Sequence, residues 1–260
     1  MRYEPDEIIR SRRRTLALEI KKDGRFVVRA PYHAGVQEIN EFLDSKQAWI
    51  AKTLEKCSLR MSRALNVDFK QKSTFPFLGR MIGLDYHDGR SLKLCGADIL
   101  NRLPADEPSD FRLLKDVTLL LPSPAFRRDG IALGSVPCTP EKEAEENRRL
   151  VSSWYRRQAA SILKARTALY AARMGLEPRR VSVTKARTCW GSCNAKCGIN
   201  YSLHLICVSI REIDYVVVHE LSHIRHRDHS AAFYAEIEKI LPDHKKRSAA
   251  LEQDSWVLDL

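Results

Sequence analysis

The chain has 260 residues and a formal net charge of +11 at neutral pH. Its hydrophobic fraction of 44% and charged fraction of 30% are typical of a globular protein with one large domain or two small ones. No apolar run approaches the roughly 18 residues of a membrane-spanning helix, and the start, MRYEPDEIIRSRRRT, lacks the apolar middle of a signal peptide. We therefore expect a cytoplasmic protein with no membrane partner and with reduced cysteines.

The positive charge is scattered along the chain rather than gathered in one segment. The longest basic runs are RSRRR at residues 10–14 and HKKR at residues 244–247, and four Arg-Arg pairs lie between them. Such scatter favours solvated surface faces. Nucleic acid stays an open alternative as a partner, because a strongly basic chain can bind polyanions without a compact patch.

The first third of the chain predicts a hairpin followed by a helix. Residues 15–20 and 25–30 alternate apolar and polar side chains, and Asp23-Gly24 between them is typical of a two-residue turn. One apolar stripe at helical spacing follows, made of Val36, Ile39, Leu43, Trp49, Ile50 and Leu54. From residue 60 to 135 we expect loops and short strands, the clearest at 77–87 and 117–122.

The sequence of the second half of the chain predicts helices around a small sheet. Thr139 and Pro140 are suited to begin a helix, and Gly175 and Pro178 to end it after about 35 residues, continuous or broken in two. Strands are expected at 179–185 and 198–208, and helices after them, including 230–242. The fold class is therefore α+β, with a β-rich N-terminal region at 1–135 and a second domain at 136–260.

The stretch VVVHELSHIRHRDHSAAF, residues 216–233, contains the candidate metal ligands and the candidate proton acceptor. His219 and His223 lie four residues apart, so a helix places both imidazoles on one face, where they can hold one zinc ion. Glu220 is rotated about 100° from His219 and can accept a proton beside the metal. The opposite face of the helix is apolar and predicts burial: Ile213, Val217, Leu221 and Ile224.

A catalytic zinc site needs a third protein ligand and one position left for water. His229 is the preferred candidate, because the polar RDHS stretch lets the chain turn and bring this imidazole back over the metal. If His226 were the third ligand, the three imidazoles would lie almost in line along about 10.5 Å of straight helix. That arrangement suits the tetrahedral coordination of zinc poorly. Glu236 on the following helix is the remaining alternative.

These motifs resemble the YgjP-like metallopeptidase domain, a family among the SprT-like zincins. HELSHIRHRDHSAAF is similar to its zinc signature, and RTCWGSC, residues 187–193, to its Arg-x-x-Trp-Gly-Ser-Cys motif. RRRTLALEI with DGRFVVRAP resembles its initial hairpin. The resemblance implies Zn²⁺ held by His219, His223 and His229, with Glu220 as general base. It also implies a compact zincin-like catalytic domain at 136–260, with a small sheet packed on the zinc helix and a long backing helix.

The predicted function is that of a zinc-dependent metallopeptidase, a hydrolase acting on a peptide or protein substrate. A metzincin is disfavoured, because those enzymes have glycine at the position of His226 and a later methionine turn, whereas the last methionine here is Met174. Two alternatives stay open: a metal-dependent hydrolase of a nucleotide phosphoanhydride, and a nucleic-acid-associated protein with a structural zinc. A binding module with a relic site is disfavoured by the intact Glu220.

Several neighbouring residues are candidates for supporting roles. The strand at 198–204 is expected to be an edge strand that pairs with an extended substrate. Oxyanion stabilisation is suggested for Tyr201 or Tyr234, and orientation of a ligand imidazole for Asp214 or Asp228. Trp190 and Ser192 are expected to be structural. The evenly spaced thiols could form a second metal site, although buried or loop thiols are the commoner role: Cys189, Cys193 and Cys197.

Overall fold

The computed structural model describes residues 3–21, 24–65, 67–89, 92–95, 117–123 and 139–259. The chain divides into two compact units, residues 1–66 and 67–260. The boundary predicted near residue 135 lies outside the described residues and stays a prediction. None of the helices in the described part has the length and apolarity needed to cross a membrane.

The first unit is a three-stranded sheet with one helix. Strands β2 (Ala17–Ile20) and β3 (Phe26–Pro31) pair antiparallel, as the alternating pattern predicts, and Gly24 takes the left-handed φ of 84° that the turn requires. The sequence prediction lacked β1 (Glu7–Ser11), which pairs parallel with β3.

Helix α1 (Val36–Leu65) covers this sheet with a narrower stripe than predicted. Ile39, Leu43 and Ile50 are buried against β3, whereas Val36 and Trp49 are exposed. The prediction was wrong for these two, because a helix that packs on one face of a small sheet buries only the side chains directly over it.

The second unit begins with a four-stranded sheet in the order β4-β5-β7-β6. Its strands are β4 (Thr74–Phe77), β5 (Arg80–His87), β6 (Lys93–Cys95) and β7 (Thr118–Pro122). Strands β5 and β7 are parallel, and the two outer pairs are antiparallel. The strands predicted at 77–87 and 117–122 correspond to β5 and β7.

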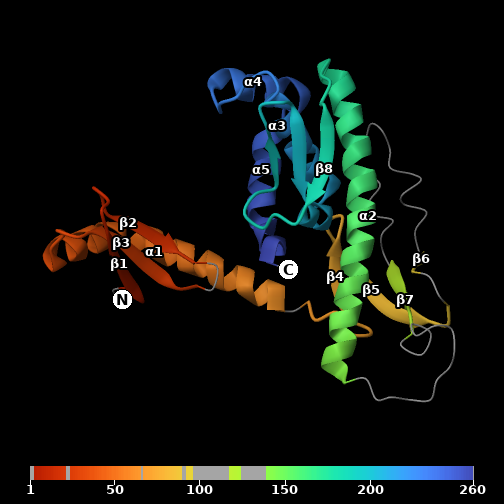
Figure 1. Ribbon diagram of the computed structural model, residues 1–260, viewed down its shortest axis with the longest axis horizontal. Helices are drawn as coiled ribbons and strands as arrows, with labels where there is room; N and C mark the ends of the chain where they lie inside the picture. Colours follow the sequence, from red (N-terminus) through yellow and green to blue (C-terminus); the bar gives the residue numbers. More distant parts are fainter. Residues whose placement is uncertain are drawn as a thin grey trace. The chain divides into compact units, whose positions relative to one another are not determined.

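Helix α2 (Pro140–Met174) is continuous over 35 residues and links the two sheets of the second unit (Figure 1). Thr139 accepts a hydrogen bond from the Lys142 N–H, and Gly175 ends the helix in the left-handed region at φ 61°, as predicted. The helix stays unbroken because it is buried along most of its length. Trp154 packs its ring 4.7 Å from that of Phe77 on β4. The later turns of α2 pack against helix α3 (Ile210–Ser222).

The second sheet has the order β8-β10-β9, with β8 (Arg180–Thr184), β9 (Gly191–Cys193) and β10 (Gly198–Ser202). Strand β10 is central, parallel to β8 and antiparallel to β9. Residues 203–208 were predicted as a continuation of this strand, but Leu203–Cys207 form a 3₁₀ helix, η3, which the Ser202 side chain caps.

Four helical segments follow: α3 (Ile210–Ser222), α4 (Ala231–Ile240), α5 (His244–Gln253) and η4 (Asp254–Asp259). Helix α3 is nearly enclosed, because it packs against α2, α4, α5 and β9. Its predicted apolar face is buried at Ile213, Val217 and Leu221, whereas Ile224, which lies just after the end of α3, is half-buried. The protein is therefore α+β, with the small sheet and the long helix packed around α3.

Candidate metal centre

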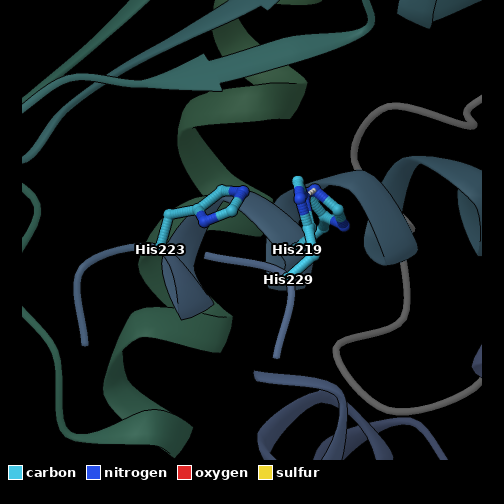
Figure 2. Close-up of side chains that lie close together, drawn as sticks. All are labelled: His219, His223 and His229. Carbon is cyan, nitrogen blue, oxygen red and sulfur yellow. Dashed lines mark hydrogen bonds between the residues drawn. The ribbon is translucent and has the colours of Figure 1, made fainter. Parts of the chain in front are cut away.

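Three imidazoles converge where α3 ends and α4 begins (Figure 2). His219 lies in the last turn of α3, and His223 is the residue directly after that helix, with φ −66° and ψ −13°. The chain then turns, and His229 comes just before Ser230, whose side chain caps α4 by accepting from the Phe233 N–H. This turn at RDHS is what brings the third imidazole back to the first two.

The spacing of the donor atoms suits one tetrahedral ion. One ring nitrogen from each histidine lies within 4.8 Å of the others. Nε2 of His219 and Nε2 of His229 are 3.2 Å apart, and the two side chains lie next to each other in Figure 2. Two nitrogens that share a tetrahedral zinc ion at about 2.0–2.1 Å lie about 3.3–3.4 Å from each other. The donor set therefore fits zinc.

The protonation of the imidazoles also suits a cation. Burial, followed by the neighbouring His223 and His229, lowers the pKa of His219 to about 4, so its ring is neutral at pH 7. Burial also lowers the pKa of His223. Nδ1 of His223 lies 3.0 Å from the backbone carbonyl oxygen of His226, to which it can donate, leaving Nε2 with a free lone pair.

Phe233 forms a platform beneath all three histidines, and sequence reasoning missed this residue. Its ring centroid lies 4.9 Å from that of His219, 4.6 Å from His223 and 4.9 Å from His229, and the side chain is fully buried. The only sequence signal was an aromatic residue three positions after the Ser230 cap. Packing against one rigid ring restricts the rotamers of all three imidazoles.

Glu220 follows His219 directly in α3 and lies against the edge of the small sheet. It is 5% exposed, and burial raises its pKa to about 7. Gly191 on β9 leaves the necessary room: a Cβ atom there would lie 2.7 Å from Cγ of Glu220 and 2.8 Å from Oε1. A carboxyl group with a pKa near neutrality can both take up and release a proton at pH 7.

The other two candidates for a third ligand lie outside this donor group. His226 contributes its backbone carbonyl to His223 rather than a ring nitrogen to the cluster. Glu236 on α4 is engaged with the guanidinium of Arg225. Within the described ranges, the three histidines are the only group of at least three His, Cys, Asp or Glu donors placed to share an ion.

Neither aspartate suggested as an orienting residue fills that role. Both carboxylate oxygens of Asp214 accept from Arg166, each at 2.7 Å, and Tyr170 adds a hydrogen bond of 3.0 Å. Asp228 is exposed and bonds to the Ser230 side chain, which lowers its pKa. Nδ1 of His219 has no hydrogen-bond partner among the described residues.

The predicted edge strand is wrong, because β10 is paired on both sides. The edge next to Glu220 is instead β9, within the RTCWGSC motif. The hydroxyl of Tyr201 on β10 is buried 3.1 Å from Oγ1 of Thr167, so this tyrosine has a packing role. Tyr234 is 42% exposed, and its ring lies 6.4 Å from that of His229. Of the two tyrosines suggested for oxyanion stabilisation, Tyr234 is therefore the one whose side chain is accessible.

The cysteines of the CWGSCNAKC stretch face a cation. Nη1 of Arg227 lies 3.7 Å from Sγ of Cys193, and Nη2 lies 3.5 Å from Sγ of Cys197. The same guanidinium donates to the Asn194 carbonyl at 2.8 Å, which fixes the β9–β10 turn. A guanidinium against two thiols disfavours the second metal site considered above, since it would repel a metal ion. Trp190 packs against the main core, as expected of a structural residue.

Comparison with known proteins gives one match. No curated protein and no solved structure matches the chain. The model of the family described as YgjP-like, metallopeptidase domain, matches residues 14–114 and 127–254, which include the three histidines, Glu220 and Gly191. Because the match spans most of the 260 residues, the chain belongs to the YgjP-like metallopeptidase domain family.

Proposed function

We propose that this protein is a zinc-dependent metallopeptidase in which His219, His223 and His229 hold Zn²⁺ and Glu220 is the general base. The observation that carries the proposal is the convergence of the three imidazoles on one point, together with the buried carboxyl group of Glu220, which follows His219 directly and has a raised pKa. The all-nitrogen donor set is one that zinc accepts at catalytic sites, with a position left for water or substrate.

The reaction follows from the roles of the chain's own groups. When bound, a zinc ion polarises the substrate carbonyl and makes a nearby water molecule more acidic. Glu220 accepts the proton of the attacking water and passes it to the leaving amine. Its pKa of about 7 suits both steps, because the proton is neither bound too weakly nor held too tightly at neutral pH.

Strand β9 is proposed to align the substrate. It is an edge strand of the sheet and lies against Glu220 through Gly191. An extended peptide can add to such an edge through backbone hydrogen bonds. Arg227 supports this arrangement by tying the β9–β10 turn to the segment between His223 and His229. Tyr234 is the proposed hydroxyl donor to the oxyanion, since it is exposed near His229.

The test combines metal analysis with a substrate panel. Wild-type protein is expected to bind one zinc ion per chain and to cleave members of a peptide library. Glu220→Gln should keep the zinc and lose cleavage by at least about a hundredfold, whereas His229→Ala should lose the zinc.

The same panel separates the alternatives. Hydrolysis of nucleotides but not peptides would favour the phosphoanhydride hydrolase. A zinc ion with four protein ligands and no hydrolysis would favour a structural site. Full peptide cleavage by Glu220→Gln would overturn the assigned base.

A further inference from the structure

A large hollow lies between α3, α4 and α5, with a volume of about 630 Å³. Its walls include Tyr215 from α3, Tyr234 and Ala235 from α4, and His244 and Ala249 from α5. None of these residues has a role in the reaction proposed above except Tyr234. The volume is in the range of cavities that hold small ligands or substrate side chains.

The hollow begins one ring away from the metal centre. The ring of Tyr215 lies 5.9 Å from that of His219, and the ring of Tyr234 lies 6.4 Å from that of His229. Two of the three imidazoles therefore contact its walls. A substrate whose reacting carbonyl lies at the histidines has the side chain of an adjacent residue within reach of this hollow.

The wall nearest the histidines is aromatic and apolar. Helix α4 starts two residues after His229, so Tyr234 and Ala235 lie in its first turns, close to the centre. The ring of His244 stacks on Tyr234 at 6.3 Å and 24°. Three charged residues also line the hollow: Glu238 in the last turns of α4, Lys245 at the start of α5 and Glu252 near its end.

His244 adds an independent sign of a ligand. Its side chain is 4% exposed, and Nδ1 has no hydrogen-bond partner among the described residues. A buried polar atom without a partner is uncommon in a folded protein, and this one belongs to a residue that lines the hollow. After a turn of the imidazole toward the hollow, a tyrosine hydroxyl or an indole N–H at the tip of a bound ring would donate to it.

We propose that this hollow is the subsite that selects the substrate, and that it takes an aromatic side chain next to the cleaved bond. The inference rests on the proposed peptidase function. A flat ring gains from stacking on Tyr234 and His244 as well as from leaving water. A basic side chain is the competing occupant, since Glu238 and Glu252 could pair with it. Both carboxylates are exposed, however, and Glu238 lies one helical turn beyond Tyr234.

The experiment uses the full-length, zinc-loaded protein and peptides that differ at one position on either side of the cleaved bond. Phe, Tyr or Trp on one of the two sides should raise kcat/KM at least about tenfold over Ala. Ala235→Phe fills the hollow with a ring and should bring that ratio close to one. Ala232→Phe, the same change at an exposed residue of α4 that is not part of the wall, should leave the ratio unchanged.

A binding measurement separates this inference from the proposed function. With Glu220→Gln, an aromatic peptide should shift the NMR signals of Tyr234 and His244, and Ala235→Phe in the same background should abolish these shifts. If wild type cleaves nothing but the shifts are seen, the subsite stands and the peptidase proposal fails. If peptides are cleaved with no aromatic preference, with a basic preference, or with a preference that Ala235→Phe leaves intact, the subsite proposal is overturned.

Discussion

Gly191→Ala is the sharpest test of how the small sheet positions the carboxylate of Glu220, the proposed general base. The new Cβ would lie 2.7 Å from Cγ, 2.8 Å from Oε1 and 2.9 Å from Cδ of Glu220, whereas ordinary contacts begin at 3.4 Å. The carboxyl group or the strand must therefore move by about 0.7 Å. Glu220 has little solvent-facing space into which to move, because its side chain is only 5% exposed.

The expected cost follows from this displacement. A misplacement approaching 1 Å at a reacting group reduces rates by up to about a hundredfold, so we expect kcat/KM to fall by about 10- to 100-fold. The stability should fall by about 1–3 kcal/mol, as for other overpacked sites. Zinc content should stay at the wild-type level, because the three atoms nearest to the new methyl group all belong to Glu220 and not to a histidine.

The assay is peptide cleavage, run together with zinc analysis and urea unfolding. Gly198→Ala is the matched control on the same hairpin, where the added Cβ meets the exposed Asn194 side chain instead of Glu220. It should retain activity within a few-fold of wild type. If Gly191→Ala keeps wild-type kcat/KM, or loses no more than Gly198→Ala does, the close approach of β9 does not position the base.

Three further predictions follow from the same contacts. Phe233→Ala removes the buried ring beneath the histidines and should lower the free energy of unfolding by about 3–5 kcal/mol, and weaken zinc affinity in a chelator competition; wild-type affinity would exclude a platform role. Asp214→Asn leaves the guanidinium of Arg166 buried without its charge partner, and urea unfolding should show a loss of about 3–5 kcal/mol; a loss below 1 kcal/mol would contradict this. In metal-free protein, burial raises the pKa of Glu220 from its ordinary value of 4.5 to about 7, so the folded state holds an extra proton and its stability falls as the pH rises between these values. Thermal unfolding of Glu220→Gln should therefore show a gain over wild type that is larger at pH 8 than at pH 5, and an equal difference at both would refute the raised pKa.

Local patterns were sufficient for most elements and for the residues of the site. The Thr139 and Gly175 caps predicted both ends of α2, and the period of Val217 and Leu221 predicted the buried face of α3, because capping and periodicity depend on neighbours within a few residues. The separation of His219, Glu220 and His223 likewise depends only on helix geometry. The polar stretch before Ser230 predicted a turn that returns His229 to the centre.

Contacts between distant segments decided the rest. Strand order depends on which backbones find each other in space, so the sequence could not reveal that β10 is central and that β9 forms the edge above Glu220. From the sequence, Asp214 was a candidate for orienting a ligand imidazole. In the structure its carboxylate instead pairs with Arg166, which lies 48 residues earlier in the chain. The platform of Phe233 and the hollow beside Tyr234 arise from packing α4 and α5 against α3. Spacing along the chain thus determined which donor atoms are present, whereas tertiary packing determined their burial, their pKa values and the walls around them, because those properties depend on neighbours that are remote in sequence.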